Sequence, residues 1–437
     1  MTPSNEILRI EGAAPLNGTV RVHSAKNSAL YLILASLLTE EELILRDVPA
    51  LSDVLVGLEI LAHVGVDVRR EGDLLRLNAR NVHRSDAPFR LVRKMRASFV
   101  AMGALLGRCG TARIGVPGGC AFGPRPVDRH IRAFEALGAT VREEDGDFVA
   151  ERHGPLEGHV VFEAPTVGGT QNVLLATARG SRRVVIENAA LEPEVADLVE
   201  LLNAMGARIG GAGTSVLTVE GVPRLHGVDF TPIPDRIEAG TLMLAASATR
   251  GRVRLENVRA DHLTSVLAWL GRTGVWTEVD GDAIELDAAG PLHAEDLVAT
   301  PYPGLPTDLQ APFGAFLATV PGRSEVRDEV YPDRFTHVDE LRKLGARVQL
   351  DERTLRIEGG RLVGAPVHAA DIRAGGALVV ATLAAEGTSE LSGVEFLDRG
   401  YERLAPRLER LGARVQRASA QADRPATRPV HLTVPTR

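Results

Sequence analysis

The stretch Lys343-Leu344-Gly345-Ala346-Arg347-Val348 ends a helical pattern and begins a strand pattern, and it recurs along the chain. Five counterparts surround the glycines at positions 65, 138, 206, 274 and 412. With Gly345 included, successive glycines are 73, 68, 68, 71 and 67 residues apart. A glycine just after a helix is typical of a left-handed C-cap, because glycine has no side chain to oppose a positive φ. The regular spacing predicts six copies of one unit of about 70 residues.

The material between these glycines repeats as well. Each unit opens with a helix rich in small and apolar residues, continues with a short strand, a loop and an amphipathic helix, and closes with a hairpin. Examples of the opening helix lie at 27–38, 95–106 and 376–385, of the short strand at 183–188 and 252–258, and of the amphipathic helix at 195–205. Six βαβαββ repeats of this kind predict an α/β (α+β) fold.

A unit of this length has a two-layer core of its own, so we expect two three-unit domains rather than a solenoid. The predicted domains are 1–24 plus 231–437 and 25–230, and the chain crosses between them in the proline-rich stretch 228–235. The tail at 417–428 is interpreted as a long hairpin loop before a last strand at 430–434.

Composition limits the possible functions. The chain has 437 residues, of which 44% are apolar, and this is enough for several globular domains. A net charge of −7 and an aromatic content of 4% argue against nucleic-acid binding. We expect no membrane segment and no signal peptide. The two cysteines cannot form a disulfide framework, which favours a cytoplasmic location, and Cys109 is predicted to be a small buried residue.

The segment 116–126 contains three glycines, three prolines, Cys120 and Arg125, and it has no helical or strand period. Such a segment forms a surface loop, and packing gives no reason for a cysteine there. A nearby arginine favours the reactive thiolate. We therefore interpret this loop as a moving catalytic lid.

Charged residues recur at two equivalent places of the units. One place is the start of the opening helix, with Lys26-Asn27, Arg96, Asp308 and Asp371-Ile372-Arg373. The other is the loop before the amphipathic helix, with Cys120 to Arg125, Arg334 and Arg399. Helix N-termini and guanidinium groups favour anions, so a cleft between the domains would form a basic pocket. The ordinary alternatives are solvated helix faces for the cations and a first-turn helix acid for Asp308. Common nucleotide-binding, nucleophile and metal motifs are absent, and the scattered histidines predict no metal site.

Taken together in order, these pieces resemble the UDP-N-acetylglucosamine enolpyruvyl transferase family over essentially the whole chain. The matching motifs are 25–27, 95–98, 117–120, 123–128, 187–194, 234–241, 306–310, 371–374 and 398–403. The resemblance implies the enolpyruvyl transferase fold, an inside-out α/β barrel of two three-unit domains, with the N-terminal strand joining the C-terminal domain.

The resemblance also implies a reaction. The enolpyruvyl group of phosphoenolpyruvate would pass to the 3-hydroxyl of UDP-N-acetylglucosamine with release of phosphate, as the first committed step of peptidoglycan synthesis, without a metal or cofactor. It makes Cys120 the acid-type residue and Asp308 the base. The implied phosphoenolpyruvate-binding residues are Lys26, Asn27, Arg96, Arg125, Arg334, Arg373 and Arg399. The implied UDP-N-acetylglucosamine contacts are Asn27, Arg96, Arg125, Pro126, Val127, Asp128, Arg129, Thr166, Val167, Gly168, Asp308 and Val330.

Three positions depart from the family pattern, namely Ser24, Pro124 and Arg129. Two other functions stay open on the residues alone: an enolpyruvylshikimate phosphate synthase-type transferase, which lacks the Pro-Gly-Gly-Cys lid, and a non-catalytic nucleotide-sugar-binding paralogue. An RNA-terminus-modifying relative is disfavoured by the negative net charge.

Overall fold

The computed structural model describes residues 6–92, 96–115 and 127–419, with the side chains of residues 96 and 97 left out. Several predictions of the sequence fall outside this range. They concern Cys120, Pro124, Arg125, Pro126, the side chain of Arg96 and the strand at 430–434.

The fifth unit shows the repeating design. It runs β18 (Leu297–Ala299), α10 (Thr307–Leu317), β19 (Gly322–Asp328), α11 (Val338–Lys343), β20 (Arg347–Asp351) and β21 (Thr354–Gly359). Strand β18 pairs in parallel with β19, which pairs antiparallel with β21, and β20 closes the antiparallel edge. This is the βαβαββ unit that the sequence predicts, and the described residues contain six such four-stranded sheets.

The other units have the same order with the following elements. The first contains β14 (Asp229–Phe230), α1 (Lys26–Ala35), η1 (Ser36–Leu38), β3 (Glu42–Leu45), α2 (Ser52–Val64), β4 (Asp67–Glu71) and β5 (Leu74–Asn78). The second contains β6 (Asp86–Ala87), α3 (Phe89–Val92), η2 (Arg96–Val100), α4 (Ala101–Cys109), β7 (Thr111–Gly115), α5 (Asp128–Ala136), β8 (Ala139–Glu144) and β9 (Asp147–Arg152). The third contains β10 (Gly158–Val161), α6 (Val167–Thr177), β11 (Arg183–Glu187), α7 (Pro193–Ala204), β12 (Arg208–Gly210) and β13 (Val216–Glu220).

The fourth contains β2 (Asn17–Arg21), α8 (Arg236–Ala248), β15 (Arg252–Glu256), η3 (Ala260–Leu263), α9 (Thr264–Arg272), β16 (Trp276–Asp280) and β17 (Ala283–Asp287). The sixth contains β22 (Pro366–His368), α12 (Ile372–Ala384), β23 (Thr388–Ser392), α13 (Val394–Leu397), α14 (Leu404–Arg410), β24 (Arg414–Ser419) and β1 (Glu6–Glu11).

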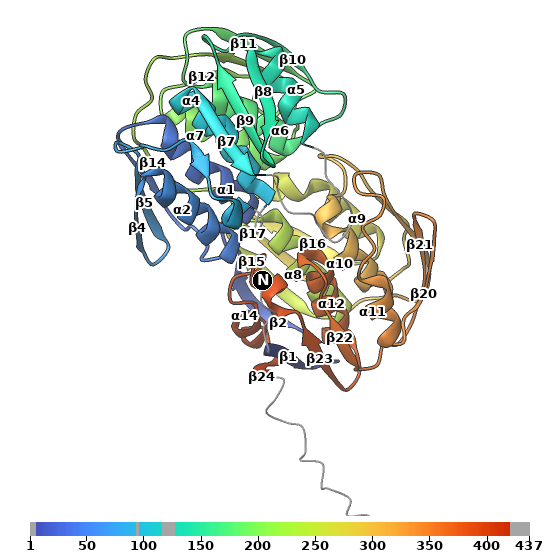
Figure 1. Ribbon diagram of the computed structural model, residues 1–437. Coiled ribbons are helices and arrows are strands. Elements are labelled where there is room, and N and C mark those ends of the chain that lie inside the picture. Colours follow the sequence, from blue (N-terminus) through green and yellow to red (C-terminus); the bar gives the residue numbers. More distant parts are fainter. Residues whose placement is uncertain (1–5, 93–95, 116–126, 420–437) are drawn as a thin grey trace, which may run out of the picture.

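Three strands complete the sheets of units that are distant from them in sequence. The N-terminal strand β1 lies between β23 and β24, and β2 pairs with β15. Both therefore lie in the lobe built from the C-terminal half (Figure 1). Strand β14 instead returns to pair with β3 of the first unit. The two connections between the lobes run side by side, because Ser24 bridges Pro234 and the amide of Ala25 donates to the carbonyl of Ile233 at 2.7 Å.

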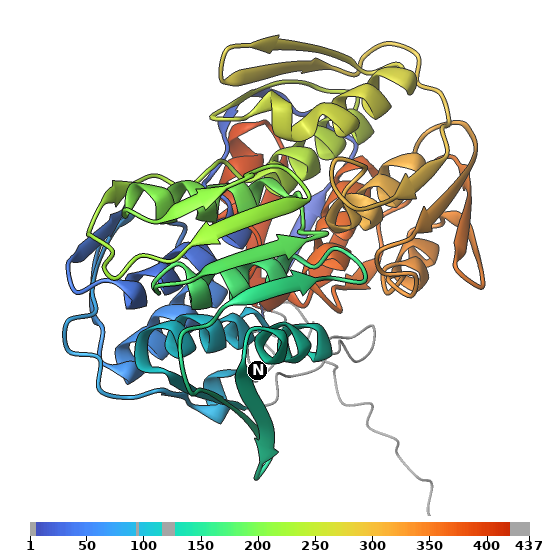
Figure 2. The same ribbon diagram turned by 90° about the horizontal axis from the view of Figure 1, so that it is seen from above.

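The hydrophobic residues form two separate cores. One collects residues between 29 and 225, and the other collects residues 8–22 together with 237–415. Helices α8, α10 and α12 pack against one another inside the second core, and all thirteen residues of α8 are buried. A helix that is apolar on all sides belongs in a core, and the sheets lie outside it (Figure 2). The domain boundaries drawn from the sequence are compatible with these two cores and stay a prediction.

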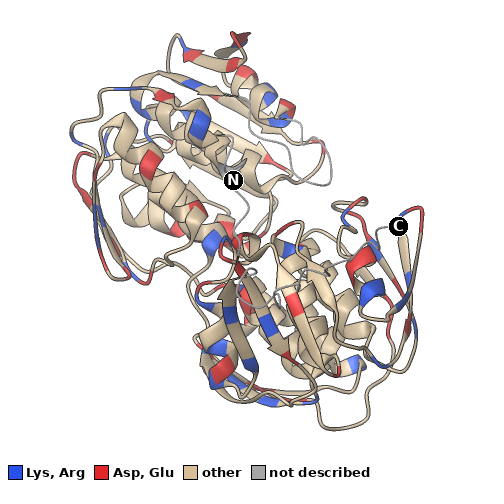
Figure 3. Cartoon of the chain, turned by 60° about the horizontal axis from the view of Figure 1, so that its bottom comes forward, with Lys and Arg blue, Asp and Glu red and all other residues tan. Residues whose placement is uncertain are grey.

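Two details of the sequence can be checked directly. The six repeat glycines have φ between 82° and 105°, so the predicted left-handed caps are confirmed. The prediction of a buried Cys109 is wrong: Cys109 is the last residue of α4 and its side chain is exposed, because the buried part of the helix ends at Gly107. No helix among the described residues has the length and apolar character needed to cross a membrane. Acidic and basic residues are both spread over the outer elements of the two lobes (Figure 3).

Candidate active site

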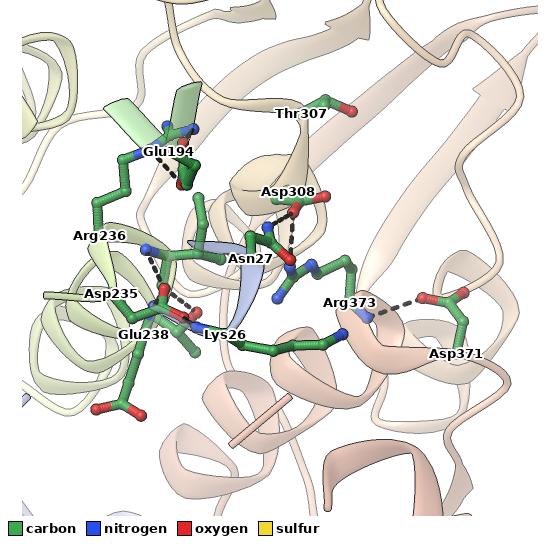
Figure 4. A network of polar contacts seen from close by, with 12 residues as sticks. Lys26, Asn27, Glu194, Asp235, Arg236, Glu238, Thr307, Asp308, Asp371 and Arg373 are labelled. Carbon is green, nitrogen blue, oxygen red and sulfur yellow. Dashed lines mark hydrogen bonds and ion pairs between the residues drawn. The ribbon is translucent and has the colours of Figure 1, made fainter. Parts of the chain in front are cut away.

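Asp308 is the centre of a polar network between the lobes. Its Oδ1 accepts a hydrogen bond from Nη1 of Arg334 at 2.8 Å, and its Oδ2 accepts one from Nη2 of Arg373 at 2.6 Å. Nδ2 of Asn27, from the other lobe, lies 3.4 Å from the same Oδ2. Figure 4 shows Asn27 and Arg373 meeting at this carboxylate. The two arginine side chains are 8% exposed and that of Asp308 is 24% exposed, so the carboxylate is reachable while its partners are buried.

The local sequence explains why these groups meet. Asp308 lies in the first turn of α10, whose N-cap is Pro306 and makes no side-chain cap. The carboxylate of Asp308 therefore binds the arginines instead of capping its own helix. Arg373 lies in the first turn of α12, where Oδ1 of Asp371 accepts from the amides of Arg373 and Ala374 at 2.8 and 3.0 Å. Capping of this kind fixes the start of α12 and directs Arg373 toward Asp308.

A second network surrounds Lys26, the first residue of α1. Its Nζ lies 2.7 Å from Oδ2 of Asp53, and Oδ1 of Asp53 accepts from Nε of Arg399 at 3.0 Å. Asp53 belongs to α2 in one lobe and Arg399 follows α13 in the other, so this carboxylate joins cations across the interface. The backbone amide of Lys26 also donates to Oδ2 of Asp235, the N-cap of α8.

The electrostatics of both networks follow from burial and charge. Burial would raise the pKa of Asp308, but Arg373 and Arg334 outweigh it and hold that pKa well below its usual value. Burial lowers the pKa of Lys26, Asp53 opposes this shift, and the nearby guanidinium groups of Arg373 and Arg399 add to it. The site thus gathers buried cations around two ionised carboxylates, an arrangement suited to a multiply charged anion.

A buried ion pair ties the lobes together beside these networks. Nε and Nη2 of Arg236 donate to the two carboxylate oxygens of Glu194 at 3.1 and 3.2 Å, and both side chains are less than 10% exposed. The guanidinium group lies 5.4 Å from the centre of the Tyr302 ring. This bidentate contact fixes the start of α7 against the start of α8.

Two groups of the predicted nucleotide-sugar residues, 127–129 and 166–168, lie at adjacent helix N-termini. Val127 precedes α5, which begins with Asp128 and Arg129, and both of these are exposed. Oγ1 of Thr166 accepts from the amide of Gly169 at 3.3 Å and so caps α6, which begins with Val167 and Gly168. Helices α5 and α6 pack together, with Nδ1 of His130 2.9 Å from Nδ2 of Asn172. Two helix N-termini side by side favour an anionic group.

The structure brings Lys26, Asn27, Asp308, Arg334, Arg373 and Arg399 into the two networks described above. Val330 follows β19, where its amide donates to Asp328 at 2.9 Å. For Arg96 only the backbone position, at the start of η2, is described.

Sequence reasoning missed Asp53 and the pairing of Glu194 with Arg236. The repeat contained a signal for both acids, because each lies in the first turn of its unit's amphipathic helix. This is next to the loop position that Arg334 and Arg399 occupy in their units. An acid in a first turn is ordinary, so neither residue stood out from its sequence as the cations and the cysteine did.

Comparisons with known proteins agree with this architecture. The family model of EPSP synthase (3-phosphoshikimate 1-carboxyvinyltransferase) matches residues 10–408. UDP-N-acetylglucosamine 1-carboxyvinyltransferase of Thermus thermophilus is 53% identical over 407 residues, which cover 92% of this chain and 95% of that protein. The protein of the same name from Deinococcus radiodurans is 50% identical over 403 residues, with 92% and 95% covered.

Solved structures show the same fold. The enolpyruvyl transferase NikO from Streptomyces tendae superposes with a TM-score of 0.86 at 26% identity, covering 95% of this chain and 99% of that one. EPSP synthase from Acinetobacter baumannii has a TM-score of 0.73 at 17% identity, with 94% and 99% covered, and is a likeness of fold alone. The predicted enolpyruvyl transferase fold is therefore confirmed, and this chain is an enzyme that belongs to the UDP-N-acetylglucosamine 1-carboxyvinyltransferase family within the EPSP synthase family.

Proposed function

We propose that this chain transfers the enolpyruvyl group of phosphoenolpyruvate to the 3-hydroxyl of UDP-N-acetylglucosamine and releases phosphate. The observation that carries this proposal is the convergence of Lys26, Arg334, Arg373 and Arg399 on two carboxylates between the lobes. Phosphoenolpyruvate has a phosphate and a carboxylate, and several fixed cations suit such a ligand. The names of the relatives supply the identity of the acceptor.

The chemistry has two stages. A proton is added to C3 of phosphoenolpyruvate while the sugar oxygen bonds to C2 and its proton passes to a base. The resulting tetrahedral adduct then loses a C3 proton and phosphate, which restores the double bond. In this proposal Asp308 is the base, Cys120 is the acid-type residue, and the cations stabilise the charge that develops on the phosphate and carboxylate oxygens. No cofactor enters any step.

Asp308 needs a change of partners to act as a base. A carboxylate held by two guanidinium groups binds a proton weakly. An incoming phosphate or carboxylate competes for Arg334 and Arg373, and each hydrogen bond that moves to the substrate raises the proton affinity of Asp308. Substrate binding therefore activates the base in this mechanism.

The nucleotide part of the acceptor is assigned to the starts of α5 and α6. Their amides would face the diphosphate, with Val127 to Arg129 and Thr166 to Gly168 beside it. We extend the proposal to Arg96, Arg125, Pro126 and Val330 as further contacts. Peptidoglycan precursor synthesis in the cytoplasm is the corresponding cellular role.

The alternatives are weaker on specific grounds. A shikimate phosphate acceptor rests on the 17% identical EPSP synthase, whereas relatives of about 50% identity carry the nucleotide-sugar name. A non-catalytic paralogue would have no use for Asp308 held between two arginines. Both alternatives make different predictions for a phosphate-release assay.

The test measures phosphate release from phosphoenolpyruvate with each acceptor in turn. We expect release with UDP-N-acetylglucosamine and none with shikimate phosphate. Release with shikimate phosphate alone would establish the other transferase, and no release with either acceptor would refute catalysis.

A further inference from the structure

The carboxylate of Asp53 has no part in the chemistry above, and yet it is one of the most deeply enclosed charges between the lobes. Its side chain is 6% exposed, and each oxygen contacts one cation, Lys26 at 2.7 Å and Arg399 at 3.0 Å. An acid in the first turn of a helix ordinarily interacts with the helix N-terminus. In α2 the N-cap is Leu51 with no side-chain cap, so the oxygens of Asp53 are directed at the two cations instead.

From this geometry we infer that Asp53 is a positioning residue for the reaction, which holds Lys26 of one lobe and Arg399 of the other together as a single binding pair for the anionic substrate. The inference rests on the proposed function, because it takes phosphoenolpyruvate as that anion.

The surrounding charges explain why Lys26 needs this partner. Lys26 is buried, and among the described residues the positive groups that act on it are Arg373 of α12 and Arg399. Its backbone amide contacts Asp235 of α8, whose carboxylate also caps that helix. Asp53 is the carboxylate that reaches the Lys26 ammonium group. A buried ammonium group beside other cations loses its proton readily, and a neutral amine binds an anion weakly.

Arg399 depends on Asp53 in a different way. The segment that carries Arg399 touches the 50–53 segment of the other lobe at two points, since Oε2 of Glu402 also accepts from the amide of Ala50 at 3.0 Å. Glu402 docks the segment without contacting Lys26, while Asp53 docks it and supplies the shared charge. A change at Glu402 therefore affects only the docking of this segment, whereas a change at Asp53 affects both the docking and the charge that compensates Lys26 and Arg399.

The experiment compares Asp53→Asn, Asp53→Glu and Glu402→Ala with the unaltered chain in the phosphate-release assay, at several pH values and with thermal unfolding measured in parallel. For Asp53→Asn we expect the KM for phosphoenolpyruvate to rise about tenfold or more, with a much smaller change in the KM for UDP-N-acetylglucosamine. The alkaline rise of the phosphoenolpyruvate KM should begin at a lower pH, because Lys26 loses its counterion. Asp53→Glu should keep the pH dependence of the unaltered chain, and Glu402→Ala should keep both the KM and the pH dependence.

An unchanged phosphoenolpyruvate KM in a folded Asp53→Asn chain would overturn the inference. An equal effect of Glu402→Ala would also overturn it, because docking alone would then explain the result. If Asp53→Asn unfolds, the folded Asp53→Glu chain decides. Its pH dependence must match that of the unaltered chain while its KM for phosphoenolpyruvate rises. A shifted pH dependence or an unchanged KM contradicts the inference. The unaltered chain separates the two proposals, since its failure to release phosphate would refute the proposed function itself.

Discussion

Replacement of Asp308 by asparagine separates its proposed role as a base from a role in binding. The change removes one negative charge and keeps the size of the side chain, so Asn27, Arg334 and Arg373 stay in contact with a neutral amide. Loss of a general base typically lowers a rate about 10²- to 10⁴-fold. We expect kcat to fall within that range.

The KM for phosphoenolpyruvate should move in the opposite sense. The Asp308 oxygens lie 2.8 and 2.6 Å from the guanidinium nitrogens. At an effective dielectric constant of about 20, a pair of charges at such distances attracts by roughly 6 kcal/mol, before desolvation is subtracted. An anionic substrate must compete with that attraction in the unaltered chain but not in Asp308→Asn. The KM for phosphoenolpyruvate should therefore stay the same or fall.

The assay is phosphate release with phosphoenolpyruvate varied at saturating UDP-N-acetylglucosamine. Asp339→Asn is the matched control, because Asp339 is also a first-turn helix acid but is 83% exposed and pairs with Arg342 of its own helix. The control should have unchanged kinetics. A tenfold or larger rise in the phosphoenolpyruvate KM of Asp308→Asn, or a kcat within tenfold of the unaltered chain, would refute the reasoning.

Three further predictions concern stability and the lid. Burial would raise the pKa of Glu238, but hydrogen bonds and charge from His23 and Arg407 lower it from 4.5 to about 2. The ionised carboxylate thus contributes about 3 kcal/mol of stability, which is fully present above pH 4.5 and is lost as pH falls toward 2. Glu238→Gln should lose that amount at pH 7 in urea unfolding followed by tryptophan fluorescence, and the difference from the unaltered chain should shrink in acid. Fosfomycin, an epoxide that mimics phosphoenolpyruvate, should inactivate the chain by alkylating Cys120, and mass spectrometry should find no adduct on Cys120→Ser. Gly376→Ala should destabilise the chain by about 1–3 kcal/mol, measured in the same urea assay, because its Cβ would lie 2.5 Å from a buried tyrosine hydroxyl.

The repeat made most of the fold predictable. Periodic glycines, helical spacing and strand alternation are local signals, and each unit forms its sheet largely from its own residues. The exchange of strands is not local. Strand β14 has only the two residues Asp229–Phe230 and no period, so its return to β3 follows from the position of its partner rather than from its own sequence.

The site shows the same division between local and distant information. Lys26, Arg334, Arg373 and Arg399 could be predicted, because cations at repeat-equivalent places stand out from an apolar helix start. Asp53 could not be distinguished in this way, since an acid in a first turn is ordinary and its partner Arg399 is 346 residues away. The exposure of Cys109 was missed for a related reason, because burial at a helix end depends on what packs beyond it.

The two carboxylates of the site also hold the lobes together. Asp53 of the first lobe binds Arg399 of the second, and Asp308 of the second binds Asn27 of the first. Each of these two contacts therefore uses a group that the proposed substrates also need. A substrate anion that draws Arg399 to itself weakens the contact of Arg399 with Asp53 between the lobes and replaces it with one through the ligand. Because substrate binding and the contact between the lobes use the same charges, the affinity for phosphoenolpyruvate and the free energy of that contact must be linked reciprocally.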